Sequence, residues 1–571
     1  MKHCVLDGIG PFFRHHPAGR INWSKIPFSS IEQDGGIPQQ THDQIIRDFE
    51  VVCRTASEWG YNIITLDDLA HLSPHADYQE SLNRKLSDYG KLYRELFATS
   101  RRYGLNVWIT TDIMFYEAGR RPDSGNQLEY ACSRLAEILG KVFEAYPEVT
   151  GVIFRIGESD GHDVQGDFIS QMIIRSPRQG RQLIDAILPV FERFNRLLIF
   201  RTWSVGAYKI GDLIWNQKTY DKLFGGISSE QLLVSIKYGE SDFFRYLRLN
   251  PLFRKSGPGK IIELQARREY EGFGEYPSFI GRDFEHYRNE VKTMPDVMGF
   301  SVWCQTGGWS SYRRLTFLDK NAIWNEINTW ICVKLFKDGL TAEGAVRGYF
   351  QNSNLSGRWD QLLELLDRSE TVVKNVLYLD DFAGRRIYFR RLRIPPLLAV
   401  YWDRIFINGA LRKIQRCFVY DGELKIQQAI DGLKQLDRMK ELAAVLSLPV
   451  DDIEFEQDTL RLLALARIYY FRDVDEEILF RLTEAVAEYQ QRYGDRAYHV
   501  SLDTKHWKMS RTWLKRVFSI LLREKRSYRW LDRIITIRIL SMLYVISRPF
   551  RKKFVPEFAR KQAMGIDVIF R

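Results

Sequence analysis

The sequence predicts an α/β protein, a (β/α)8 (TIM) barrel followed by a mainly α-helical C-terminal domain. Short apolar runs alternate with amphipathic helical segments through residues 1–335. These runs are apolar throughout rather than at every second position, which is typical of parallel strands buried on both faces. Eight such runs occur, which is the number of strands in this barrel. The alternative, an open doubly wound sheet, is less well supported because the sequence lacks a phosphate-binding glycine turn.

The elements follow in order along the chain. In the first helical segment, 41–60, Thr41 is a candidate N-cap and Gly60 a candidate C-cap. Further helical patterns lie between later strands, at 82–104, 128–146 and 178–194. The eight predicted strands are 3–7, 62–66, 105–110, 151–156, 196–202, 232–237, 260–264 and 298–303.

Beyond residue 340 the pattern becomes helical, at 340–350, 358–378, 424–446 and 459–471. We therefore predict a catalytic barrel at 1–335 and a helical domain at 336–500. A basic helical tail at 501–571 is either separate or part of that domain. This tail holds 18 Lys and Arg against 5 Asp and Glu, which leaves 65 basic and 67 acidic residues at 1–500. A neutral bulk argues against nucleic acid as a partner.

The cysteines and the N-terminus indicate the compartment. Six scattered cysteines without a CxxC pair predict neither a disulfide framework nor a zinc site. The N-terminus lacks the apolar core of a signal peptide, and no run is long enough to span a bilayer. We expect a cytoplasmic protein.

Polar residues follow the predicted strands at their C-terminal ends, where barrel active sites form. We expect acidic, basic and tryptophan side chains to meet at this mouth. Glycoside hydrolysis needs one protonated and one ionised carboxyl group, Arg and Lys bind an anionic sugar, and Trp stacks on a pyranose. The residues concerned are Arg155, Glu158, Arg201, Trp203, Lys237, Asp242, Glu263, Arg267, Arg268, Glu269, Trp303 and Trp309. The alternative is an ion-pair network that only closes the rim.

Two stretches carry a family resemblance. LLVSIKYGESDFFRYLRLNPLF and the following IIELQARREYEGFGEY resemble the α-glucuronidases of glycoside hydrolase family 67, which pair IKxGxxDF…R with LELQxxxEYxG. GVIFRIGESDG is similar to the family's acid-bearing strand and LLIFRTWSVG to its Arg-bearing strand. The resemblance spans residues 1–350 in patches.

The resemblance implies an inverting hydrolase that removes a terminal uronic acid from an acidic oligo- or polysaccharide, without metal or organic cofactor. Glu158 would be the general acid, and Asp242 and Glu269 would flank the water, one or both as base. Arg201, Lys237 and Arg155 would hold the uronate, with Trp309 in the sugar pocket. The chain departs from the family in showing no β-rich domain before its first strand, and Arg268 replaces a Gln.

Other candidates have two interpretations each. His15 and His16 could bind sugar hydroxyls or lie in a solvated loop. Asp67, Asp68 and Asp112 could bind hydroxyls, but we expect them to cap helices.

The segment 527–554 mixes apolar and basic residues. It could lie on an anionic membrane, pack on the helical domain or bind acidic polysaccharide. The competing functions are therefore a non-catalytic carbohydrate-binding protein and a membrane-peripheral protein of polysaccharide metabolism, and an oligomer is compatible with either.

The tetrapeptide GESD occurs twice, at 157–160 and 239–242. Both copies follow a predicted strand, so we expect equivalent places in the barrel rather than an internal repeat. We expect Glu158 to act in the first copy and Asp242 in the second, with Asp160 and Glu240 as spectators.

Overall fold

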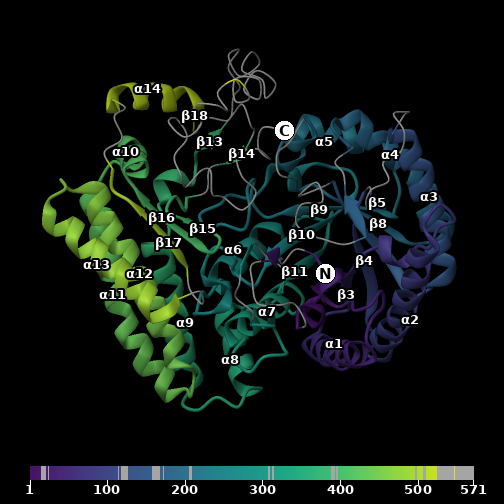
Figure 1. Cartoon of the computed structure of the whole chain (residues 1–571), viewed down its shortest axis with the longest axis horizontal. Coiled ribbons are helices and arrows are strands. Elements are labelled where there is room, and N and C mark those ends of the chain that lie inside the picture. Colours follow the sequence, from purple (N-terminus) through teal and green to yellow (C-terminus); the bar gives the residue numbers. More distant parts are fainter. Residues whose placement is uncertain are drawn as a thin grey trace.

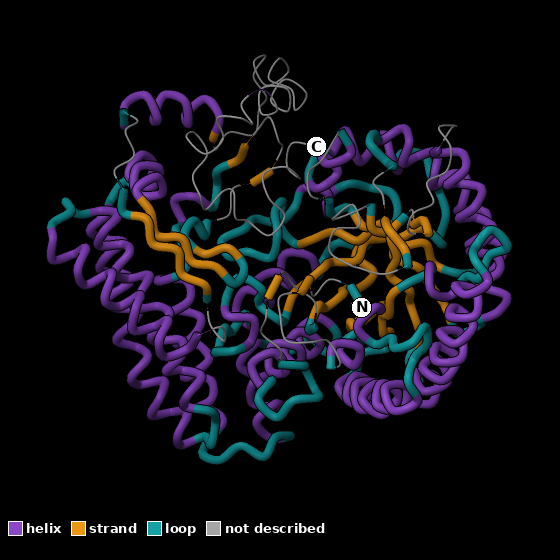
Figure 2. The backbone as a smooth tube through the Cα atoms, viewed as in Figure 1, coloured by secondary structure: helices purple, strands orange, loops and turns teal. Residues whose placement is uncertain are grey.

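Eight parallel strands close into a barrel in the computed structural model, as predicted (Figures 1 and 2). The strands are β1 (His3–Asp7), β3 (Ile63–Asp67), β4 (Asn106–Asp112), β6 (Val149–Arg155), β8 (Leu197–Arg201), β9 (Leu232–Lys237), β10 (Gly259–Gln265) and β11 (Val297–Trp303). The described residues are 1–14, 21–22, 25–113, 115–117, 127–156, 167–170, 173–204, 209–305, 309–310, 314–387, 392–393, 396–494, 498–505, 510–523 and 546.

Helices surround the barrel, and each of them follows a barrel strand along the chain. They are α1 (Gln39–Trp59), α2 (Glu80–Arg102), α3 (Gln127–Ala145), α4 (Pro177–Phe194), α5 (Gln217–Phe224), α6 (Gly281–Val291) and α7 (Ile323–Phe336). Between β9 and β10 every residue is described, and the only helical element there is the short 3-10 helix η5 (Pro251–Arg254). One of the eight predicted strand–helix units therefore lacks its α-helix.

The predicted N-cap of helix α1 is wrong. The helix begins at Gln39 after Pro38, two residues before Thr41, so Thr41 is not its N-cap. Gly60 does cap its C-terminus, with φ at 107°, a left-handed value that favours glycine.

A helical C-terminal region follows the barrel and lies to its left in Figure 1. It comprises α8 (Ala342–Gln351), α9 (Trp359–Val376), α10 (Gly409–Phe418), α11 (Gly422–Val445), α12 (Val450–Phe471), α13 (Glu476–Tyr493) and α14 (Arg511–Leu521). Two small sheets, which the sequence did not predict, join its distant segments. In one, β16 (Arg404–Asn408) lies between β15 (Val400–Tyr401) and β17 (His499–Asp503). In the other, β13 (Arg386–Ile387) lies between β14 (Leu392–Arg393) and β18 (Leu522–Arg523).

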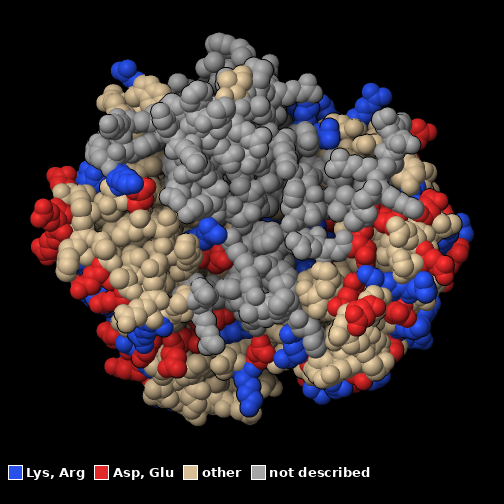
Figure 3. All heavy atoms as spheres, viewed as in Figure 1, with Lys and Arg blue, Asp and Glu red and all other residues tan. Residues whose placement is uncertain are grey.

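The remaining short strands pair in the loops, β2 (Ile21–Asn22) with β12 (Trp309–Ser310) and β5 (Phe115–Glu117) with β7 (Phe168–Ser170). On the face shown in Figure 3, the described residues include basic and acidic groups that lie side by side. None of the described helices is long and apolar enough to cross a membrane. The segment 527–554 lies outside the described residues, apart from Ile546.

Apolar side chains fill the half of the barrel interior that lies towards the N-terminal ends of the strands. They form one cluster of Val5, Ile63, Trp108, Ile153, Ile199, Leu233 and Ile261. Trp108 is the largest of these, and Gly151 on the neighbouring strand makes room for it. A Cβ atom at Gly151 would lie 2.8 Å from the indole.

We therefore expect Gly151→Ala to lower the free energy of unfolding by about 1–3 kcal/mol, because the added methyl group overpacks the barrel interior. Gly140 in α3 is the matched control, since apart from its chain neighbours and the backbone of its own helix nothing lies within 4 Å of its Cβ position. Gly140→Ala should be neutral or stabilise by up to about 1 kcal/mol. Denaturant unfolding of both variants measures the difference, and equal effects would contradict this account of the interior.

Candidate active site

The half of the barrel interior that lies towards the C-terminal ends of the strands is polar. Side chains alternate along a strand, so the residue two positions after an inward apolar residue also faces inward. In this way Ile153 is followed by Arg155, Ile199 by Arg201 and Ile261 by Glu263. The inward residues near the C-terminal strand ends are Asp7, Asp67, Asp112, Arg155, Arg201, Lys237, Glu263, Gln265 and Trp303.

Arg155 lies in a group of ion pairs on one side of the mouth. Its Nε is 3.2 Å from Asp112 Oδ1, and its Nη2 is 3.8 Å from Asp67 Oδ1. Asp112 also accepts a hydrogen bond of 2.8 Å from Lys25 Nζ. Burial raises the pKa of Asp67 to about 6, against the attraction of Arg155. Asp67 instead accepts from the backbone N–H of Ile26 at 3.0 Å, and Asp68 accepts from the N–H of His71 in a 3-10 turn, whereas the expected capping by Asp112 stays a prediction.

Arg201 and Glu263 form a second buried pair. Arg201 Nε lies 3.0 Å from both carboxylate oxygens of Glu263, and the guanidinium carbon lies 4.5 Å from the centre of the Trp303 ring. Ser235 donates a further hydrogen bond of 2.7 Å to Glu263. The carboxylate thus fixes the guanidinium in front of the tryptophan.

Lys237 holds the carboxylate of Asp242. Its Nζ lies 2.5 Å from Asp242 Oδ1, and it also lies 3.5 Å from the centre of the Trp203 ring. The hydroxyl of Tyr270 and the backbone N–H of Phe243 donate to Asp242 at 2.7 Å and 3.0 Å. Burial alone would raise the pKa of Asp242, but Lys237 and these donors outweigh it and lower the pKa. Asp242 is therefore an anion at neutral pH.

Glu269 has the opposite protonation state. Burial and the negative charge of Asp242 raise its pKa to about 8, although Lys237, Arg267 and Tyr270 favour its anion. The two predicted acids thus form one electrostatically coupled pair, with Asp242 ionised and Glu269 carrying a proton at neutral pH.

The loop after β10 presents Glu269 through an unusual backbone turn. Gly272, Phe273 and Gly274 all have positive φ, at 86°, 56° and 79°. Gly274 also packs closely, because a Cβ atom there would lie 2.3 Å from Asn325 Oδ1. The GFG sequence is thus needed for the turn that follows Glu269.

Arg268 takes part in the protein's own contacts. Its Nη2 lies 2.6 Å from Glu271 Oε1 and 2.8 Å from the carbonyl oxygen of Phe243. Its predicted role in substrate binding stays a prediction. Arg268 and Asp242 also line a cavity of about 20 Å³, with Lys237, Glu263 and Gln265 among its other polar residues, which is room for about one water molecule.

Several predicted residues lie outside the described part of the chain. These are Glu158, Asp160, His15 and His16, and for Trp309 only the backbone is described, in β12. Their roles stay predictions. Among the described residues no group of His, Cys, Asp and Glu could hold a metal ion. All six cysteines are buried and free of disulfides.

The sequence interpretation missed two kinds of residue. Tyr270, part of the EYEG stretch, was not recognised as a donor to Asp242, and this stretch was the available signal. Glu240 also has a structural contact that the sequence did not indicate, because it is buried and forms an ion pair with Arg386 of β13, while its role as a spectator of the reaction stays a prediction. No local pattern connects two residues so distant along the chain.

The fold and the site together define a class of protein. It is a closed barrel of parallel strands with a pair of carboxyl groups and several cations at its mouth. No protein-family model and no curated protein matches this chain. Solved structures of similar fold include a GH138 enzyme targeting pectin rhamnogalacturonan II, at 10% identity and a TM-score of 0.48. The match covers 87% of this chain and 62% of that enzyme, so the chain spans less than two thirds of its length.

Two further structures illustrate the range of barrels that resemble the chain. The Thermobaculum terrenum O-GlcNAc hydrolase matches at 10% identity and a TM-score of 0.37, over 90% of this chain and 95% of that one. A D-allulose 3-epimerase from Methylomonas matches at 8% identity and a TM-score of 0.33, over 60% of this chain and 99% of that one. Likeness at this level concerns the fold alone.

The protonation of Glu269 has a consequence for stability. An unfolded glutamate ionises near its ordinary pKa of 4.5, whereas Glu269 keeps its proton in the folded state up to about pH 8. The unfolded state therefore binds fewer protons between these values, and stability falls as pH rises through them.

We expect Glu269→Gln to raise the unfolding midpoint at pH 7–8, with the gain shrinking towards pH 5, because glutamine carries no ionisable group. Thermal unfolding across pH 5–8 measures this. Glu80→Gln is the control, since Glu80 lies on the surface with an 88% exposed side chain. A pH-independent gain would contradict the assignment.

Proposed function

We propose that this chain is a glycoside hydrolase that removes a terminal uronic acid from an acidic oligo- or polysaccharide with inversion. One observation carries the proposal, namely that the carboxyl groups of Asp242 and Glu269 meet beside Lys237 and Tyr270 at the C-terminal mouth of the barrel, where their surroundings push their pKa values apart. Separating the pKa values of two carboxyl groups is how sites assign acid and base roles. The glycoside hydrolases among the similar folds are consistent with this activity, but they do not specify it.

The protonation states divide the work within the pair. A general base must be ionised, and Asp242 is kept so by Lys237, Tyr270 and the N–H of Phe243. Asp242 is therefore the base that takes a proton from the attacking water. Glu269, which carries a proton, donates a hydrogen bond to that water or to a sugar hydroxyl and orients it.

The leaving group needs a separate proton donor, and Glu158 is proposed for it from the family resemblance. In an inverting enzyme the acid and the base lie about 6.5–9.5 Å apart, which leaves room for the water. A retaining enzyme would hold them about 5–5.5 Å apart.

The cations favour an anionic sugar. Lys237 and Arg201 lie on adjacent strands, β9 and β8, and each is also next to an indole ring, Trp203 and Trp303. Such a combination suits a pyranose that carries a carboxylate, because the ring packs on the indole while the cations neutralise the acid. A substrate carboxylate would add one negative charge beside Asp242 and Glu263, and this would help keep Glu269 protonated.

A screen of α- and β-linked aryl uronosides beside neutral glycosides tests the proposal. We expect turnover of a uronoside only, with inverted configuration in the first-formed anomer by NMR. Activity should fall above about pH 8 as Glu269 loses its proton.

Asp242→Asn and Glu158→Gln should each lower kcat by about 10²–10⁴-fold, because each removes one proton-transfer group. Asp160→Asn is the matched control in the first GESD copy and should change kcat little. Turnover of neutral sugars alone would remove the role of Arg201 and Lys237. Unchanged function in Glu158→Gln without any glycoside turnover would support a non-catalytic binding protein instead.

A further inference from the structure

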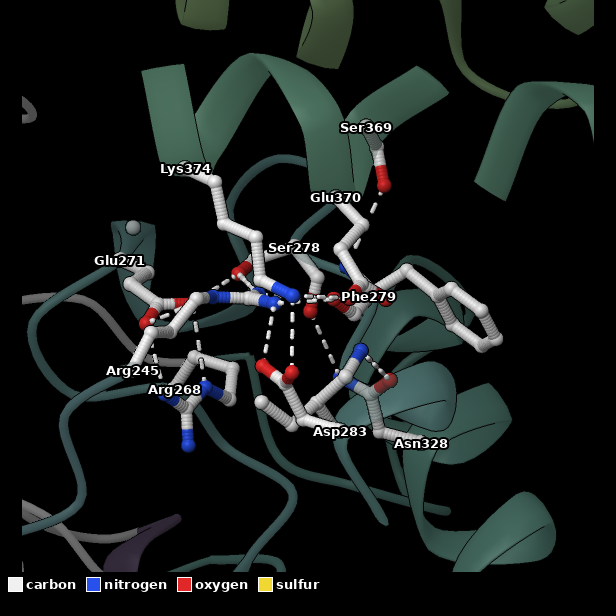
Figure 4. A network of polar contacts seen from close by, with 12 residues as sticks. Arg245, Arg268, Glu271, Ser278, Phe279, Asp283, Asn328, Ser369, Glu370 and Lys374 are labelled. Atoms are coloured by element: carbon white, nitrogen blue, oxygen red, sulfur yellow. Dashed lines mark hydrogen bonds and ion pairs between the residues drawn. The ribbon is translucent and has the colours of Figure 1, made fainter. Parts of the chain in front are cut away.

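A fully buried carboxylate, Glu271, lies between the two loops that carry the pair (Figure 4). Arg245, three residues after Asp242, donates to it at 2.8 Å, and Arg268, next to Glu269, donates at 2.6 Å. Ser278 donates as well. These contacts lower the pKa of Glu271 far below its ordinary value despite its burial, so it is an anion that both arginines share.

The two arginines bind each other's loops. Arg268 also donates to the carbonyl oxygen of Phe243, the residue after Asp242, at 2.8 Å. Arg245 also donates to the carbonyl oxygen of Phe279, beyond Glu269 in the other loop, at 2.7 Å. The loop after β9 and the loop after β10 are therefore joined immediately beside the catalytic carboxyl groups.

The C-terminal region completes this arrangement. Tyr378, just after α9, donates its hydroxyl to Glu271. Lys374 of α9 lies 2.8 Å from Asp283, which in turn lies 3.2 Å from Arg245 (Figure 4).

The same two loops have further contacts with that region. Glu240 pairs with Arg386 of β13, and the backbone N–H of Gly272 donates to the Tyr498 hydroxyl at 2.9 Å. Both catalytic loops are thus fastened from outside the barrel.

We propose that Glu271 is a positioning residue and that the C-terminal region, through the Tyr378 hydroxyl, sets the relative placement of Asp242 and Glu269. The proposal rests on the proposed function for its kinetic consequences, while the placement itself can be measured without a substrate.

Electrostatics explains why the contacts of Glu271 with Arg245, Arg268 and Tyr378 are needed to hold the two loops together. A second carboxyl group beside the Asp242 anion is unfavourable in a buried site, and a loosened loop would move Glu269 away towards solvent. Among the described residues, the charged and titratable groups that act most strongly on Glu269 are Asp242, Lys237, Arg267 and Tyr270. A looser loop weakens all their contributions together with the burial, and burial is the largest of them.

Tyr378→Phe removes one hydroxyl and keeps the ring. We expect kcat on the uronoside to fall about 10-fold with KM nearly unchanged, because misplacement of a reacting group is costly even when the substituted residue is remote. The alkaline limb of the pH–kcat profile should move to lower pH, because Glu269 then loses its proton more readily. An unchanged kcat and pH profile in folded Tyr378→Phe would overturn the proposal.

Tyr470→Phe is the matched control. Tyr470 is equally buried and its hydroxyl donates to the carbonyl oxygen of Phe406, away from both loops. It should lose comparable stability while kcat and the pH profile stay as in the unmodified protein. The same kinetic change in both variants would indicate a general loss of stability, and it would also overturn the proposal.

A substrate-free measurement separates this proposal from the proposed function. The stabilisation that Glu269→Gln produces between pH 7 and 8 is compared in the unmodified and the Tyr378→Phe backgrounds. If Tyr378 helps to place Glu269, the gain should shrink by at least half in Tyr378→Phe and stay unchanged in Tyr470→Phe. An equal gain in all backgrounds contradicts the positioning role, whereas absence of glycoside turnover with a shrunken gain contradicts only the proposed function.

Discussion

The unfavourable burial of two carboxyl groups side by side is the constraint on which the barrel mouth depends. Asp242 is stabilised as an anion by Lys237 and two hydrogen-bond donors, so the cost falls on Glu269, which keeps a proton instead. Two loops must be held rigidly for this difference to persist. The shared anion Glu271 joins these loops, and its loss would leave Arg245 only the longer contacts with Asp283 and Glu370.

The C-terminal region is therefore part of the site rather than an appendage to the barrel. Its contacts converge on two loops, those after β9 and β10, which bear the two carboxyl groups. The short element η5 replaces a helix between these strands, so the loop after β9 has no long helix of its own to pack against. Tyr378, Arg386 and Tyr498 contact these loops from outside the barrel.

The sequence predicted most of the barrel because its signals are local. Apolar runs such as LLVSIK can only be buried on both faces, and all eight predicted strands exist within a few residues of their predicted ends. The polar residues after these runs were predicted to converge because the C-terminal ends of the barrel strands meet at one mouth. Partner choice was not predictable, since Glu240 pairs with Arg386 across 146 positions of chain and Glu271 with residues of three segments.

The described cations of the mouth are all close to carboxylates, and this bears on how an acidic sugar would be recognised. Arg155 lies beside Asp112, Arg201 beside Glu263 and Lys237 beside Asp242. A nearly neutral rim attracts a uronate weakly at long range, so selectivity has to come from contact geometry. Indole rings lie beside both Arg201 and Lys237, and under the proposed function they would align a pyranose before its carboxylate meets the cations. A neutral sugar would also stack on the indole rings, but it would bring no carboxylate to contact Arg201 and Lys237. The rim would therefore distinguish a uronate from a neutral sugar through these direct contacts rather than through its net charge.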